Sequence, residues 1–234
     1  MTRQSQKNEE LYFARKASEL LDESWSVEES PNEEEWPDLI VSNQNVKFGL
    51  EVRSIFKDES KTGSNTKGIE SIRISRLKLL ADTYYKKTSV PINLNIRGDM
   101  DKSEIDDIAL FLANAVIQLK EQEKGERDKF GVKFYITRLP PSFENYSRWK
   151  NINDYVGWKS KLIQEILVNA VLAKESKLAK YRKNIPDMRL LLVLNTIKNS
   201  GRADLPEDFN NIKSEFNDIY VMLYPDRIYR LNCG

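Results

Sequence analysis

Two hydrophobic periods alternate along the chain, and their order predicts helices interleaved with strands. Apolar residues at helical spacing predict helices over residues 8–23, 69–87, 103–124, 154–183 and 208–216. Short apolar or alternating runs predict strands over residues 24–27, 38–41, 46–56, 90–96, 131–140 and 189–195, with a hairpin over 218–232. This order favours an α/β fold with a mixed central sheet.

The polar segment 57–68 has the Gly and Ser content of an exposed loop. It separates a strand from a helix within the alternating pattern, so we interpret it as a surface loop. The sequence therefore predicts a single domain over residues 1–234.

The hairpin over residues 38–56 carries charged residues inside its apolar runs. Asp38 opens the first strand, and Glu51 and Arg53 lie in the second. Because side chains alternate along a strand, Glu51 and Arg53 share one face, and a short turn brings Asp38 near that face. The pattern predicts two carboxylates and a cation in one place.

Composition narrows the chemistry that such a site can perform. The chain has no histidine, and its one cysteine, Cys233, is next to the last residue. Histidine-dependent catalysis, zinc–thiolate sites and disulfides are therefore excluded. The 37 basic and 36 acidic residues nearly cancel, so any basic surface must be local. No glycine-rich phosphate loop is present to favour an enzyme of small phosphorylated molecules.

Two neighbouring carboxylates repel each other unless a cation neutralises them. Mg²⁺ suits this role because it binds carboxylate and water oxygens, and Mn²⁺ can substitute for it. Such an ion can polarise a phosphoryl oxygen and activate water. Asp38 and Glu51 are the predicted metal ligands.

The "PD" of Pro37 and Asp38, followed after twelve residues by "EVR", resembles the motif of the PD-(D/E)XK nuclease superfamily. Its core is a helix, a three-strand meander, a helix and a further strand, and the resemblance places this restriction-endonuclease-like core at residues 8–97. Residues 98–234 are expected to extend the same sheet with further helices and strands. The resemblance implies metal-dependent cleavage of DNA, with Asp38 and Glu51 as metal ligands.

Arg53 occupies the position where the family usually has lysine. Its guanidinium can bind phosphate but cannot lose a proton, so both an active enzyme and an inactive binding module remain open. Lys57, Lys61 or Lys67 in the following loop are alternatives for the missing ammonium.

Many members of the family also have a glutamate on the first helix. Among Glu10, Glu19 and Glu23, Glu10 shares the helix face of Phe13 and Ala17, so it is the preferred candidate. A solvated glutamate in the first helical turn is the alternative.

Other charged and aromatic residues have ordinary explanations. A solvated helix end explains the basic cluster of Lys174, Lys177, Lys180, Arg182 and Lys183 at least as well as phosphate binding does. Core positions are expected, rather than a base-stacking surface, for the aromatics Tyr84, Tyr85, Phe130, Phe134 and Tyr135. Trp149 and Trp158 are left open, because their irregular segment suits partner contact as well.

The sequence thus predicts a Mg²⁺-dependent DNA endonuclease. The alternative is a nuclease-fold module that binds nucleic acid or a protein without cleavage. No apolar run approaches the roughly 20 residues needed to span a bilayer, so a cytoplasmic protein is expected. A protein partner or a homodimer is compatible with these features.

Overall fold

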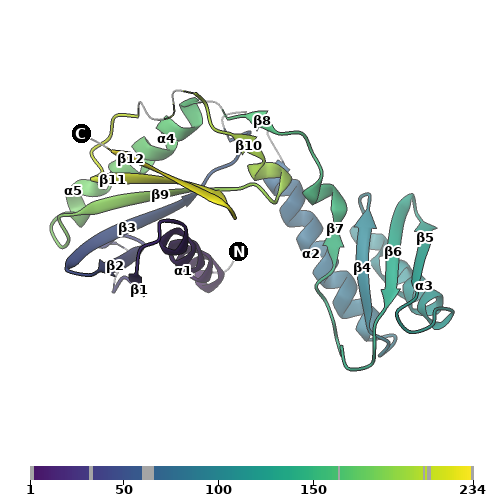
Figure 1. The fold of residues 1–234 in the computed structure, drawn as a ribbon. Helices are drawn as coiled ribbons and strands as arrows, with labels where there is room; N and C mark the ends of the chain where they lie inside the picture. The colour runs from purple at the N-terminus through teal and green to yellow at the C-terminus, as the bar shows by residue number, and fades with distance from the viewer. Residues whose placement is uncertain are drawn as a thin grey trace. The chain divides into compact units, whose positions relative to one another are not determined.

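The computed structural model describes residues 3–31, 34–59, 66–162, 164–207, 209 and 212–232. It divides the chain into two compact units (Figure 1). The six-stranded unit contains residues 1–64 and 158–234, and the four-stranded unit contains residues 65–157. None of the helices described in either unit has the length and apolar character to cross a membrane.

The six-stranded unit has a mixed sheet with the order β1-β2-β3-β9-β11-β12. Its strands are β1 (Trp25–Glu29), β2 (Leu39–Asn43), β3 (Val46–Ser54), β9 (Met188–Asn195), β11 (Asp218–Tyr224) and β12 (Arg227–Asn232). The first three form an antiparallel meander, whereas β3, β9 and β11 are parallel neighbours. The predicted mixed sheet in an α/β fold is confirmed.

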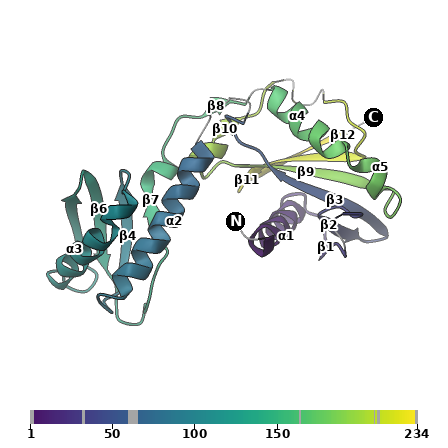
Figure 2. The same cartoon turned by 180° about the vertical axis from the view of Figure 1, so that it is seen from behind.

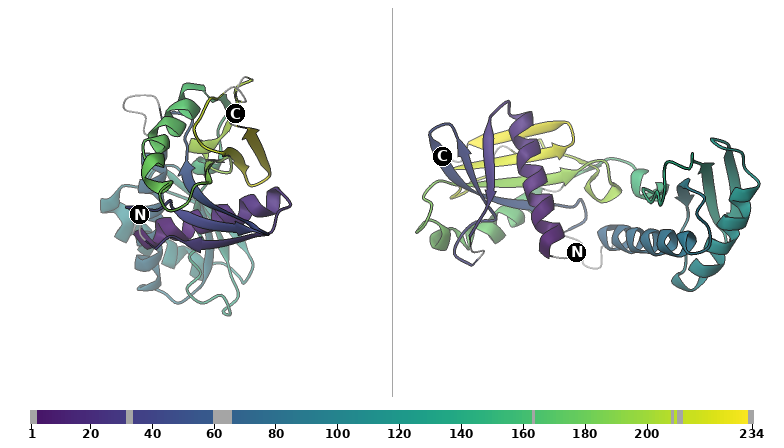
Figure 3. Two further views of the ribbon diagram at one scale, coloured as in Figure 1. Left: turned by 90° about the vertical axis from the view of Figure 1, so that its left-hand side faces the viewer. Right: turned by 90° about the horizontal axis from the view of Figure 1, so that it is seen from below.

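Helices cover both faces of this sheet (Figure 3). On one face α1 (Arg3–Leu20) packs against an apolar cluster that includes Phe13, Leu50, Val52 and Leu191. On the other face α4 (Gln164–Glu175) and α5 (Leu178–Tyr181) cover a second cluster that includes Leu190 and Leu192. Because both faces are buried, β9 is an almost continuous apolar run rather than an alternating one.

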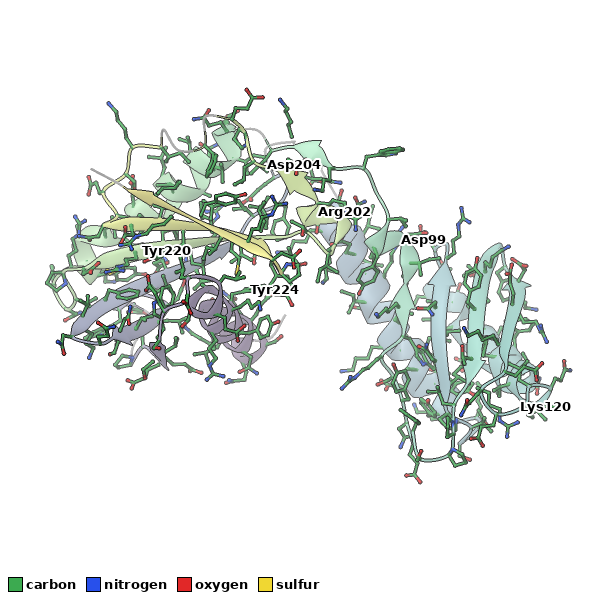
Figure 4. The ribbon with its side chains drawn as sticks, viewed as in Figure 1. Asp99, Lys120, Arg202, Asp204, Tyr220 and Tyr224 are labelled. Atoms are coloured by element: carbon green, nitrogen blue, oxygen red, sulfur yellow. The ribbon has the colours of Figure 1, made fainter. Side chains whose placement is uncertain are left out.

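The smaller elements of this unit lie between β3 and β11 in sequence. They are β8 (Ser160–Lys161), β10 (Ala203–Asp204) and the short helix η3 (Asn199–Gly201). Strands β8 and β10 form a separate parallel pair, and Figure 4 labels Arg202 and Asp204 at β10 and Tyr220 and Tyr224 on β11.

The four-stranded unit has its own sheet with the order β5-β6-β4-β7. Its elements are α2 (Thr66–Tyr85), β4 (Ile92–Arg97), η1 (Lys102–Glu104), α3 (Ile105–Ile117), β5 (Lys124–Lys129), β6 (Val132–Arg138), β7 (Lys150–Asn151) and η2 (Ile152–Tyr155). Both α2 and α3 pack on the same face, as the view from behind shows (Figure 2). Trp149 and Tyr84 belong to this core.

The predicted extension of the first sheet by residues 98–234 holds for β9, β11 and β12 but not for β5, β6 and β7, which form a second sheet with β4. The physical reason is that β4 pairs with β6 and β7 instead of with the meander. The predicted helix over 154–183 is also wrong at its start, where η2 and β8 precede α4. The predicted helix over 208–216 and Cys233 lie partly or wholly outside the described residues.

Candidate active site on the β2–β3 hairpin

The hairpin geometry brings Asp38 and Glu51 together. The register pairs Asn43 with Val46 and Leu39 with Leu50, so the next positions, Asp38 and Glu51, are neighbours across the two strands. The Asp38 side chain also accepts a hydrogen bond from the backbone N–H of Val52 at 2.9 Å. This bond fixes the carboxylate against the C-terminal half of β3.

Gly49 allows the close packing that holds this part of the hairpin. A Cβ atom at position 49 would lie 2.6 Å from Met188 Sδ and 2.7 Å from Pro37 Cγ. Such distances are well inside normal contact, so only glycine lets Pro37 and the first residue of β9 approach β3 here. Asp38 follows Pro37 directly, and its position therefore depends on this contact.

The cation at the carboxylate pair is Lys174, near the end of α4. Its Nζ atom donates to Asp38 Oδ2 at 3.1 Å and forms a short contact with Glu51 Oε2. Only 17% of the Lys174 side chain is exposed, so the interpretation of Lys174 as part of a solvated helix end is wrong. The ammonium lies between the two carboxylates.

A sequence signal for this lysine exists in the apolar stripe of α4. Ala170 and Val171 are buried against the sheet, and Lys174 follows them by four and three residues. That spacing places Lys174 on the buried helix face. The signal for the role of Lys174 is thus a lysine on the apolar face of a helix that packs against a sheet that bears carboxylates.

Glu51 is fully buried, with no exposed side-chain surface. Burial raises the pKa of Glu51, the charge of Asp38 raises it further, and Lys174 opposes both effects. For Lys174, burial lowers the pKa, but Glu51 and Asp38 outweigh it and the net shift is upward. The pair therefore holds a charged lysine beside a carboxyl group whose ionisation is disfavoured.

One oxygen of this site lacks a partner. Glu51 Oε1 is buried and accepts no hydrogen bond from any residue that the structure describes. A buried acceptor without a partner costs about 1–3 kcal/mol. Together with two carboxylates and a single ammonium, this oxygen fits a bound hard cation. No group of three acidic, histidine or cysteine side chains with metal geometry occurs among the described residues, so water or substrate oxygens would complete its coordination.

Arg53 does not join the carboxylate pair. It shares the α4 face of β3 with Glu51, but its Nη2 atom binds Glu59 Oε1 at 2.6 Å. A cavity of about 230 Å³ lies beside it, lined by Arg53, Glu59, Ile166 and Asn169. The predicted convergence of Arg53 with Asp38 and Glu51 is thus replaced by that of Lys174.

Glu10 is buried, with 6% of its surface exposed, as its helix face predicted. It accepts a hydrogen bond from Gln6 at 3.0 Å, and its Oε2 atom lies 3.4 Å from Lys7 Nζ. Lys7 also donates to the backbone oxygen of Asp38 at 3.2 Å. Burial first, and the charge of Asp38 second, raise the pKa of Glu10. Glu10 is therefore linked to Asp38 through Lys7, and its part in catalysis stays a prediction.

The other predicted alternatives lie elsewhere. Glu19 pairs with Lys16 at 2.9 Å, and Glu23 accepts hydrogen bonds from Trp25 and Asn43. Lys57 donates to Asn199 at 2.7 Å, and Lys67 belongs to α2 of the four-stranded unit. Lys61 lies outside the described residues.

Comparison with known proteins gives no match: no family model, no curated protein and no solved structure is significantly similar to this chain.

Proposed function

We propose that the chain is a metal-dependent nuclease that hydrolyses phosphodiester bonds in DNA, built on a restriction-endonuclease-like core. The observation that carries the proposal is the cluster of Asp38, Glu51 and Lys174, in which Glu51 Oε1 has no hydrogen-bond partner. A buried cluster with two carboxylates and only one ammonium is typical of a site that binds a further cation.

The element order supports the core in a revised form. Helix α1, the β1–β2–β3 meander, helix α4 and strand β9 occur in this order in the six-stranded unit, with only the short elements β8 and α5 between them, and β9 pairs parallel to β3. The closing helix and strand of the proposed core are thus α4 and β9, rather than residues 69–97. The four-stranded unit is inserted between β3 and α4.

Each residue has a role in this proposal. Asp38 and Glu51 would hold Mg²⁺, which polarises a phosphoryl oxygen and lowers the pKa of an attacking water. Lys174 supplies the ammonium that the motif lacks at Arg53, and it is placed to stabilise negative charge on a phosphate at the carboxylates. Arg53 lines the neighbouring cavity, where its guanidinium can bind an adjacent phosphate in exchange for Glu59.

The test is nicking of supercoiled plasmid DNA by the full chain with Mg²⁺ or Mn²⁺. Asp38→Asn and Glu51→Gln are each expected to lower the rate at least about a hundredfold, the usual effect of losing a key electrostatic group. Glu28→Gln, which changes an exposed glutamate of β1, is the matched control and should leave the rate unchanged. Cleavage that survives both site substitutions would refute the assignment.

Arg53→Lys tests the alternative, a non-cleaving nuclease-fold module, because an inactive wild type that gains cleavage with this substitution would be such a module. The direct pairing of Lys174 with both carboxylates is the observation that favours this alternative, because it neutralises them in part without metal. If Lys174 is the functional ammonium, Arg53→Lys leaves the rate within about threefold, whereas Lys174→Ala abolishes cleavage. Inactivity of the wild type with Mg²⁺ bound at Asp38 and Glu51 would establish the non-cleaving module.

A further inference from the structure

The sheet of the four-stranded unit is covered on one face only. Ile92, Leu94 and Ile96 of β4 and Phe134 and Ile136 of β6 pack under α2 and α3. The residues between them point to the opposite face, which is turned toward the viewer in Figure 1. This open sheet face consists of Asn93, Asn95, Arg97, Lys133, Tyr135, Thr137 and Lys150, together with Lys124, Glu126 and Asp128 of β5, and none of these residues is buried.

The composition of the open sheet face is unusual for a merely solvated surface. Two asparagines alternate along β4, an interior strand of the sheet, although asparagine is disfavoured in strands. Among the described residues, no side-chain hydrogen bond involves Asn93, Asn95 or Arg97. Their amide and guanidinium groups remain available for a ligand.

The register places an aromatic ring at the centre of these groups. Asn95 pairs with Tyr135 on β6 and with Lys150 on β7, and Arg97 pairs with Lys133. The half-exposed Tyr135 thus has the Asn95 amide on the β4 side and Glu126 on the β5 side, where Lys133 neutralises the glutamate. Arg97 and Lys150 supply the cations on the β4 and β7 side. This combination offers a stacking surface for a base and charges for its phosphates.

Charge is distributed unevenly along the chain. Residues 65–157 contain 16 basic and 13 acidic side chains, whereas the rest of the chain contains 21 and 23. On the sheet the acidic residues Glu126 and Asp128 lie on β5, at one edge, and Glu126 pairs with Lys133 at 2.7 Å. The excess of positive charge is on the side of β4 and β7.

We propose that the open sheet face binds single-stranded nucleic acid, with Tyr135 stacking on a base and Arg97 and Lys150 contacting phosphates. A single strand is favoured over a duplex because the four strands span roughly 14 Å, wider than the major groove of about 12 Å. Unpaired bases can instead lie flat on the sheet and expose their edges to Asn93 and Asn95. The proposal depends on this surface alone and does not require cleavage.

The test measures binding of the full chain to fluorescein-labelled single strands of about 12 nucleotides by fluorescence anisotropy. EDTA is present throughout, so metal-dependent cleavage cannot contribute, and failure of this proposal is distinct from failure of the nuclease. DNA and RNA oligonucleotides are compared in parallel. Tighter binding of either one supports the proposal and identifies the natural ligand class.

Tyr135→Ala is expected to weaken binding about 10- to 100-fold, the range for loss of one base stack, whereas Tyr135→Phe retains it. Arg97→Ala is expected to reduce the slope of log K against log salt by about 0.7. Phe143→Ala in the loop after β6 and Lys120→Ala in the loop after α3 are matched controls off the sheet and should change affinity less than twofold. Figure 4 labels Lys120.

Asn95→Asp keeps the shape of the side chain but adds a negative charge, so it tests the surface without removing a ring. It is expected to weaken binding at least about fivefold, and Asn145→Asp in the loop after β6 is its control. Circular dichroism confirms that each variant is folded. The proposal is overturned if the wild type binds neither oligonucleotide at about 50 mM salt, if duplex DNA binds more tightly, or if folded Tyr135→Ala and Asn95→Asp bind as the wild type does.

Discussion

Two charged clusters lie on the large sheet, and they are built in opposite ways. The first consists of Asp38, Glu51 and Lys174, with two carboxylates and one ammonium. The second, which we call the arginine cluster, consists of Asp187, Asp218, Arg189 and Arg230, with two carboxylates and two guanidiniums. The first cluster carries one net negative charge, whereas the second is neutral.

Hydrogen bonding follows the same division. Arg189 binds both oxygens of Asp187 at 3.1 and 2.9 Å, and Arg230 binds both oxygens of Asp218 at 2.9 and 2.7 Å. Arg189 also donates to the Tyr220 hydroxyl at 2.9 Å. In the first cluster one oxygen of Glu51 is left without a partner. Balanced, bidentate pairs stabilise a fold, and an incomplete cluster indicates a place where a ligand binds.

Arg189→Ala is expected to have the largest effect on stability. The substitution leaves Asp187 and Asp218 without a shared cation and removes a guanidinium that stacks 3.9 Å from the centroid of the Phe48 ring. Loss of one partner from a buried ion pair typically costs about 3–5 kcal/mol. Chemical denaturation measures this cost, which should not change when Mg²⁺ is added. The exposed Arg227→Ala is the control, and a loss of less than 1 kcal/mol for Arg189→Ala would contradict the structural role.

Lys174→Met is expected to destabilise the chain by about 3 kcal/mol in EDTA, because it leaves two neighbouring carboxylates without their cation. Millimolar Mg²⁺ should restore more stability to this variant than to the wild type, since an ion bound only to the folded state stabilises it. Lys180→Met, which changes an exposed lysine of α5, is the matched control. Equal effects of Mg²⁺ on Lys174→Met and on the arginine-cluster variant would remove the proposed distinction between the clusters.

The local pattern predicted the carboxylates but not their cation. A two-residue turn after Asn43 places position 38 opposite position 51, so the pairing of Asp38 with Glu51 follows from hairpin geometry. Lys174 comes from a helix that follows more than a hundred residues later, and only the packing of α4 on the sheet brings it to the site. Arg53 shows the same limit: its face was predicted correctly, but its pairing with Glu59 depends on the path of the following loop.

The fold was predictable to a similar extent. Alternation and apolar runs identified most strands, including β2, β3, β9 and the hairpin of β11 and β12. The apolar runs did not predict which strands pair with each other, because β4 has the same apolar alternation whether it joins the first sheet or a second one. The division into two units therefore depends on long-range pairing that the local pattern does not specify.

Among these variants, Glu51→Gln is expected to have the smallest effect on the free energy of unfolding, but its pH dependence is the most diagnostic. Burial and the nearby Asp38 raise the pKa of Glu51, so the folded wild type holds a proton at pH values where the unfolded carboxyl has lost it. The wild type therefore loses stability as the pH rises through the folded-state pKa, and the glutamine variant does not. We expect Glu51→Gln to be more stable than the wild type at pH about 8, by about 0.5–2 kcal/mol, the gain typical of relieving a functional site. Asp38 continues to neutralise Lys174 in this variant.

This difference in stability should narrow as the pH falls below about 4, where the glutamate becomes mostly protonated in the unfolded state as well as in the folded state. Urea denaturation at several pH values in EDTA measures it, with Glu28→Gln on β1 as the exposed control. A gap that stays constant with pH, or a variant less stable than the wild type at pH about 8, would show that Glu51 is a satisfied structural carboxylate like Asp218. A stability difference that narrows as the pH falls would instead identify Glu51 as a residue whose buried charge destabilises the fold. This is expected for a metal ligand in the metal-free state.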